Sequence, residues 1–276
     1  MTVVTPAIAQ IGWLEIPAAL DGATDNTVGT LYDGSTRNYS FLYDHTTYAS
    51  LWVAYPLAPS DIEGSLTHAK WAKCDLVDED KQVDLSSSYG VSYTPTSYTN
   101  GNTYARGHQI PDADRDNTST TMLSQTYLSV NSTPQIQNGF NGGIWSSLEI
   151  AIRKEVKDYN DIVYITTGPV FQTADGKEKV TYITNSGDGN PIPVANYYYK
   201  VLLKVKGNSA SAIGFWFEHK EYNKDVVGAE AANYATYAVS VDQIEEWTGL
   251  NFFVNLSDDL ENVAESNSSW SSWTSF

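Results

Sequence analysis

YARGHQIPDADR (residues 104–115) is followed nine residues later by QTYLSVNSTPQIQNGFNGGIWSSLEIAIR (125–153), and these two stretches decide the fold. In the second stretch an apolar side chain recurs at every fourth position, at Phe140, Ile144, Leu148 and Ile152. That spacing predicts an amphipathic helix near residues 139–157. The order is then a strand that carries His108, a loop, and a helix that carries Asn141.

Outside these stretches, short apolar runs predict strands at 50–55, 162–168, 197–205, 212–217 and 234–241. Ser240 and Gln243 form a capping box for a short helix that Gly249 would end. Many strands with few helices indicate an α+β fold with a mixed, mainly antiparallel central sheet flanked by helices. We expect a single domain over 1–276, with residues 1–36 and 266–276 peripheral to it.

The composition is that of a folded protein, with 41% hydrophobic and 13% aromatic residues. No apolar run approaches the ~20 residues that cross a bilayer, so we expect no membrane partner. No signal peptide is visible at the start, which leaves an intracellular protein or one whose leader has been removed. Cys74 is the single cysteine and is interpreted as a packing residue. The sequence carries no signal for an oligomeric state.

The net charge of −17 is unusual for a protein that would contact phosphates. Residues 101–157 nevertheless contain five basic and five acidic residues, so the rest of the chain carries the whole negative charge. The segment with the chemical motifs is therefore the least acidic part of an acidic protein.

Several motifs in order along the chain resemble the DNA/RNA non-specific endonuclease family, the ββα-metal (His-Me finger) nucleases that include endonuclease G. The motifs are Arg106-Gly107-His108 with Pro111, Asn131 with Pro134-Gln135, Asn141, Trp145, Leu148-Glu149 and Arg153, then TGPVF (167–171), YYYK (197–200) and IEEWTGLNFFVNL (244–256). The resemblance covers roughly residues 38–256. One departure is Ala105, which stands where the family has an aspartate.

The resemblance implies a ββα-metal finger and a sugar-non-specific endonuclease that hydrolyses DNA and RNA to products with 5′-phosphates. It implies His108 as general base, Arg106 and Glu149 as further catalytic residues, and one Mg²⁺, or Mn²⁺ in its place, on Asn141. It also favours a secreted or periplasmic protein.

The chemistry of the residues agrees with this. Phosphodiester hydrolysis needs a base for water and a cation for the phosphate charge. Neutral imidazole is available near pH 7, and Mg²⁺ accepts few protein ligands because it retains waters. On a regular helix Asn141 and Glu149 would be about 80° and ~12 Å apart. Glu149 would then act on the ion through a water.

Three polar residues are each open to more than one interpretation. Arg106 is a phosphate clamp or half of a buried pair with a carboxylate. Asn131 holds the scissile strand or orients the site, or is a turn residue before Pro134. Arg153 pairs with Glu149 at the surface or contacts the substrate phosphate.

The alternative to an active nuclease is a catalytically weak or inactive binding module on the same fold. Its 19 Tyr and 8 Trp could provide stacking platforms for glycans. The net charge and Ala105 favour this alternative. The presence of His108, Asn141 and Glu149 argues against it.

Overall fold

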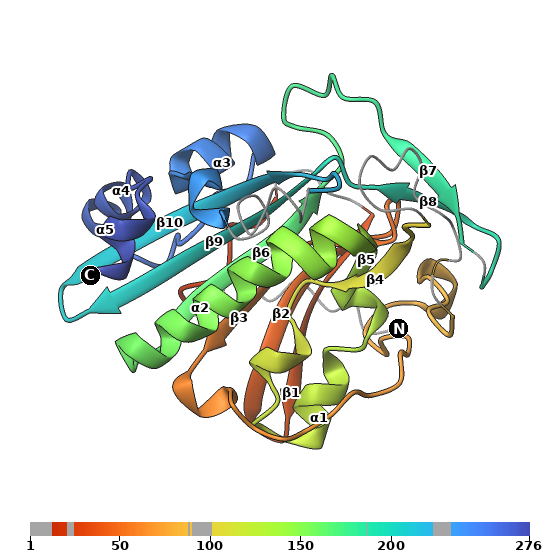
Figure 1. Ribbon diagram of the computed structural model, residues 1–276, viewed down its shortest axis with the longest axis horizontal. Helices are drawn as coiled ribbons and strands as arrows, with labels where there is room; N and C mark the ends of the chain where they lie inside the picture. The colour runs from red at the N-terminus through yellow and green to blue at the C-terminus, as the bar shows by residue number, and fades with distance from the viewer. Residues whose placement is uncertain (1–12, 21–24, 88, 90–100, 186, 223–232) are drawn as a thin grey trace.

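Seven strands form the central sheet of the computed structural model, which describes residues 13–20, 25–87, 89, 101–185, 187–222 and 233–276. The order is β1-β2-β3-β6-β9-β10-β11, and every pairing within it is antiparallel (Figure 1). The strands are β1 (Asn26–Asp33), β2 (Thr36–Asp44), β3 (Ala49–Leu57), β6 (Val163–Val170), β9 (Tyr197–Lys206), β10 (Ser209–Glu218) and β11 (Ala238–Val239). The α+β class is confirmed, and the sheet is antiparallel throughout rather than mixed.

Two small sheets and five α-helices surround it. The small sheets pair β4 (Tyr104–His108) with β5 (Ser132–Ile136) and β7 (Thr181–Thr184) with β8 (Pro191–Val194). The helices are α1 (Thr120–Gln125), α2 (Ser146–Tyr159), α3 (Val241–Thr248), α4 (Asp258–Glu265) and α5 (Trp270–Thr274). No helix among the described residues is long and apolar enough to span a membrane.

Strand β9, inside the central sheet, is buried on both faces. In β9, Tyr198 and Leu202 belong to the core on the α2 side, whereas Tyr199 and Leu203 belong to the core beneath α3 and α4. Because side chains alternate along a strand, a strand covered on both faces reads as a nearly continuous apolar run. This explains why YYYKVLLKV was recognisable. Figure 1 shows α2 across one face and α3, α4 and α5 gathered beside β10.

The segment between two paired strands carries the motif stretches. Leu57, at the end of β3, pairs with Val163, at the start of β6. The described residues between 58 and 162 therefore lie outside the central sheet, and the chain then returns to the neighbouring strand. The β4–β5 pair and α2 both lie within this excursion.

The predicted helix at 139–157 begins later than expected. Regular α-helix starts at Ser146, because residues before it depart from helical geometry: Gly139 has φ +82°, and Gly142 and Gly143 are also non-helical. A side chain at Gly139 would be strained at that φ and would collide with the backbone of Tyr222. The periodicity located the buried face of α2 and missed the irregular turn that carries Asn141.

Most of the other predicted elements are confirmed, and one strand is wrong. Strands were found within a few residues at 50–55, 162–168, 197–205 and 212–217. The helix capped by Ser240 and ended by Gly249 is confirmed: Ser240 accepts a hydrogen bond from the Gln243 amide, and Gly249 adopts φ 72°. The strand at 234–241 is wrong, since a 3₁₀ turn, the two-residue β11 and the start of α3 occupy it.

The chain ends are less peripheral than predicted. β1 forms an edge of the central sheet, and Ile16 is buried in the core on the side of α3 and α4. The tail forms α5, whose Trp273 is fully buried. Residues 1–12 and 21–24 of the expected loose segment lie outside the described residues. The burial of the tail was missed because two aromatic side chains in a Ser-rich context show no periodicity.

Candidate active site

The β4–β5 pair positions His108 at the end of a strand. His108 lies opposite Ser132, and Gly107 lies opposite Thr133. A Cβ on Gly107 would come within 2.2–2.4 Å of the Gln135 side chain, so only glycine allows the two strands to pack at this point. The chain then passes through residues 137–145 into α2. This strand–strand–helix order is the one that the family resemblance implied, whereas the residues alone predicted a strand, a loop and a helix.

The His108 ring lies between two aromatic side chains. Its centroid is 4.7 Å from that of Trp71 and 4.9 Å from that of Tyr127. Nε2 is enclosed without a hydrogen-bond partner among the described residues, whereas Nδ1 is not enclosed in this way. Burial lowers the pKa of His108 to about 4, although the nearby Asp112 carboxylate opposes this. The imidazole is therefore neutral near pH 7, which is the form that accepts a proton.

Asp112 organises the surroundings of His108 and was not recognised as a site residue in the sequence. Its Oδ2 accepts a hydrogen bond from the Tyr127 hydroxyl at 2.5 Å and lies 2.9 Å from Nδ1 of His68. Burial alone would raise the pKa of Asp112, but Tyr127, His108 and His68 lower it overall. The signal available was its position four residues after His108. Asp112 thus places a carboxylate near the base, where Ala105 supplies none.

Asn141 and Glu149 offer two oxygen donors. The Asn141 amide group donates to Gln137 Oε1 at 3.2 Å, and no described residue donates to its Oδ1. The Glu149 carboxylate makes no hydrogen bond with a described residue. Burial raises the pKa of Glu149 to about 7; Lys200 and Arg153 oppose this effect, and Asp114 and Asp112 add to it. Asp112 therefore interacts with both Glu149 and His108.

The regular-helix spacing predicted for Asn141 and Glu149 is wrong, because the non-helical Gly142 and Gly143 lie between them. The type of donor nevertheless suits Mg²⁺. An amide oxygen without a donor and a carboxylate without a hydrogen bond are hard oxygen ligands of the kind that this ion prefers.

Arg106 is the one Lys or Arg of residues 101–157 without an ion-pair partner among the described residues. Its guanidinium donates to the Leu85 carbonyl at 2.8 Å and lies 5.4 Å from the centre of the Trp71 ring. The other bases of residues 101–157 all have ion-pair partners: Arg115 with Asp61, Arg153 with Asp114, Lys154 with Asp158 and Lys157 with Glu63. The buried carboxylate pair considered for Arg106 is therefore absent among the described residues.

Arg153 pairs with Asp114 at 2.9 Å and not with Glu149, the surface pair that was one of its two interpretations. Asp114 also accepts a hydrogen bond from the Tyr55 hydroxyl at 2.8 Å. This buried carboxylate comes from a loop far from α2 in sequence, so the regular spacing within the helix could not reveal it. The pair ties α2 to the segment that follows His108.

Asn131 holds the loop after His108, which favours the interpretation that it orients the site. It is fully buried. Its Oδ1 accepts from the Ile110 amide, and its Nδ2 donates to the Ile110 and Thr126 carbonyls, at 2.8–2.9 Å. These bonds use the side-chain amide to fix the loop after His108, and no polar atom remains for a nucleic acid.

Lys200 is a second residue to which the sequence analysis gave no role, although it ends the YYYK motif. It is buried, with Nζ 3.3 Å from the Gln109 carbonyl and 4.6 Å from the Trp145 ring centre. Burial lowers its pKa, and the Glu149 carboxylate opposes that shift. The signal available for it was its position at the end of the YYYK motif, inside an apolar strand.

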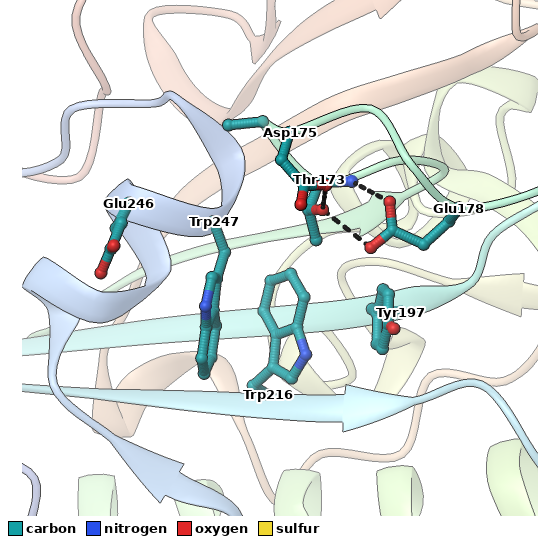
Figure 2. A pocket seen from close by; sticks show the side chains of 8 residues that line it. Thr173, Asp175, Glu178, Tyr197, Trp216, Glu246 and Trp247 are labelled. Carbon is teal, nitrogen blue, oxygen red and sulfur yellow. Dashed lines mark hydrogen bonds between the residues drawn. The ribbon is translucent and has the colours of Figure 1, made fainter.

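A pocket of about 470 Å³ lies on the other face of the sheet. Figure 2 shows its aromatic wall, in which Trp216 stands between Trp247 of α3 and Tyr197. The ring centroids are 4.8 Å and 5.0 Å apart. The loop beside it is fixed by Thr173, whose backbone amide and hydroxyl both donate to Glu178. This pocket is separate from His108.

The fold and the site define a ββα-type arrangement, and the chain belongs to the DNA/RNA non-specific endonuclease family, whose pattern matches residues 22–259. It is 34% identical to Nuclease C1 of Cunninghamella echinulata var. echinulata over 56% of this chain and 59% of that protein. It is 30% identical to the Nuclease of Serratia marcescens over 81% of this chain and 75% of that protein. The chain thus spans little more than half of the first relative.

A chain in the crystal structure of the EndoG/EndoGI complex has a similar fold. The TM-score is 0.58 at 21% identity, and the match covers 84% of this chain and 88% of the other. This likeness supports the arrangement of strands and helices. The predicted export from the cell stays a prediction.

Proposed function

We propose that this protein is a metal-dependent endonuclease that hydrolyses phosphodiester bonds of DNA and RNA with little sequence preference. The observation that carries the proposal is the neutral His108 beside an unneutralised Arg106, together with the free oxygens of Asn141 and Glu149. Family membership supports the same reaction.

In this mechanism the Nδ1 atom of His108 accepts a proton from the attacking water. Trp71 and Tyr127 hold the ring plane between them and keep bulk water away from one edge. Arg106 binds the phosphate through the guanidinium hydrogens that Leu85 leaves free. Asn141 would hold Mg²⁺ directly and Glu149 through a water; when bound, the ion stabilises negative charge on the phosphate and the leaving oxygen. The expected products carry 5′-phosphates.

The lack of sequence preference follows from the kind of contact available. Arg106 recognises phosphate, which carries no base information. Both DNA and RNA present the same phosphodiester to His108. Arg153 pairs with Asp114 and has a side chain that is 21% exposed, and we propose that it contacts a neighbouring phosphate.

Removal of divalent metal is expected to abolish cleavage. Supercoiled plasmid and a structured RNA are incubated with the protein in millimolar Mg²⁺, with EDTA, and with EDTA followed by excess Mg²⁺. We expect both substrates to be cut in Mg²⁺, neither in EDTA, and activity to return on readdition. Cleavage that persists in EDTA would contradict the metal-dependent mechanism, and absence of cleavage in every condition would favour a binding module.

The aromatic pocket of Figure 2 favours a second candidate, a carbohydrate-binding function. Sugar rings stack on aromatic faces while carboxylates accept from hydroxyls, and both types of side chain line this pocket. We expect Trp247→Ala to weaken retention on a glycan array at least severalfold and to leave plasmid cleavage unchanged. Equal glycan retention by the variant and the unaltered protein would exclude the pocket as a glycan site.

A further inference from the structure

Three carboxylates from two helices meet on the face of the sheet opposite His108. Asp242 and Glu245 come from α3 and Glu265 from α4, and one oxygen of each lies within 4.8 Å of the others. Glu265 is 4% exposed, and its Oε1 is enclosed without a hydrogen-bond partner among the described residues. Glu245 has one oxygen occupied by the Phe252 amide at 2.7 Å. A buried carboxylate with no partner is costly unless something neutralises it.

The surrounding segment supplies no cation for this purpose. Residues 233–276 contain seven acidic residues and no Lys, Arg or His. No ion pair among the described residues involves any of the three carboxylates. Glu265 is also the last residue of α4, where the negative end of the helix dipole disfavours a carboxylate.

We propose that Asp242, Glu245 and Glu265 form a Ca²⁺ site that joins α3 to α4. The three donors are hard carboxylate oxygens, the ligands that this ion takes. Two oxygens on one Ca²⁺ can be at most about 5 Å apart, since each lies about 2.3–2.6 Å from the ion. The oxygens of the cluster lie within 4.8 Å of one another, which is compatible with ligands of one Ca²⁺.

The electrostatics of the site support the need for a cation. Burial raises the pKa of Glu265 to about 9, and the neighbouring carboxylates of Glu245, Glu261 and Asp242 raise it further. Burial likewise raises the pKa of Glu245 to about 7. A divalent cation would neutralise the three carboxylates and bridge the two helices.

The test measures thermal unfolding of chelator-treated protein as Ca²⁺ is added. We expect Tm to rise by about 5 °C or more once Ca²⁺ reaches roughly 100 times its dissociation constant. Glu265→Gln should remove the rise in Tm. Asp242→Asn alters only an exposed side chain and should make the rise in Tm severalfold smaller. Glu246→Gln, an exposed carboxylate of α3 outside the cluster, is the matched control and should keep the full rise.

Asn141→Ala separates this site from the catalytic one. The Ca²⁺-dependent rise and one calorimetric binding site should persist in that background, and adding Glu265→Gln should remove both. A rise that disappears with Asn141→Ala but survives Glu265→Gln would overturn the proposal. So would a wild-type Tm that responds to acid and not to Ca²⁺, because the carboxylates would then be neutralised by protons alone.

Discussion

His108→Ala is expected to lower the rate of plasmid cleavage by about 10²- to 10⁴-fold, the usual effect of losing a general base. The reason is positional: His108 ends β4 within the site, and it is neutral near pH 7. Cleavage is measured under single-turnover conditions, with circular dichroism to verify the fold. His45→Ala is the matched control, since His45 lies beside Asp25 at the β1–β2 edge. Near-normal cleavage by a folded His108→Ala protein would refute the assignment.

The same variant reports the protonation state of the base. The pKa of His108 is about 4 in the folded protein and about 6.5 when unfolded, so the unfolded chain binds the proton first as pH falls. The free energy of unfolding therefore falls as pH drops from about 6.5 to about 4. The total loss due to His108 is on the order of 3 kcal/mol. Urea unfolding at a series of pH values should show this loss in the wild type and a smaller one in His108→Ala. Parallel curves would mean that the pKa of His108 is the same in the folded and unfolded protein.

Asn141→Ala is expected to abolish productive use of Mg²⁺, whereas Glu149→Gln should cost about 10–100-fold, the usual effect of losing a residue that acts through a ligand or water. Asn141 offers an amide oxygen without a donor, and Glu149 a carboxylate without a hydrogen bond among the described residues. Gln keeps one acceptor oxygen and removes the charge. Cleavage is measured across a Mg²⁺ titration for both variants.

The outcome discriminates between modes of metal binding. If Glu149→Gln is as inactive as Asn141→Ala at every Mg²⁺ concentration, Glu149 binds the ion directly. If Glu149→Gln is indistinguishable from wild type, the carboxylate serves only the charge balance with Lys200 and Arg153. Lys154→Gln is the control, because its exposed pair with Asp158 lies outside the site.

Local patterns predicted those elements whose surroundings repeat along the chain. Strands buried on both faces were recognisable because an unbroken apolar run such as that of β9 is typical of a strand with no solvent-facing side. The helix capped by Ser240 was predicted because its cap uses neighbouring residues only. His108, Arg106, Asn141 and Glu149 were selected because several motifs occurred together in order.

Contacts between distant segments could not be predicted in this way. Asp112 became a site residue through Tyr127 and His68, which come from other segments. The role of Asn131 stayed open between contacting substrate and orienting the site, because its motif was visible while its bonds to Ile110 and Thr126 were not. A side chain's role depends on what the fold places against it, and the sequence shows only its neighbours along the chain.

The excursion of residues 58–162 between the paired strands β3 and β6 has a consequence for how the protein can change. The entropy of closing a loop grows only with the logarithm of its length, so doubling such a loop costs about 0.6 kcal/mol. Insertions at exposed positions in this segment therefore lower the stability of the central sheet only slightly. Substrate preference can diverge by lengthening or shortening this one segment while the strand order stays the same.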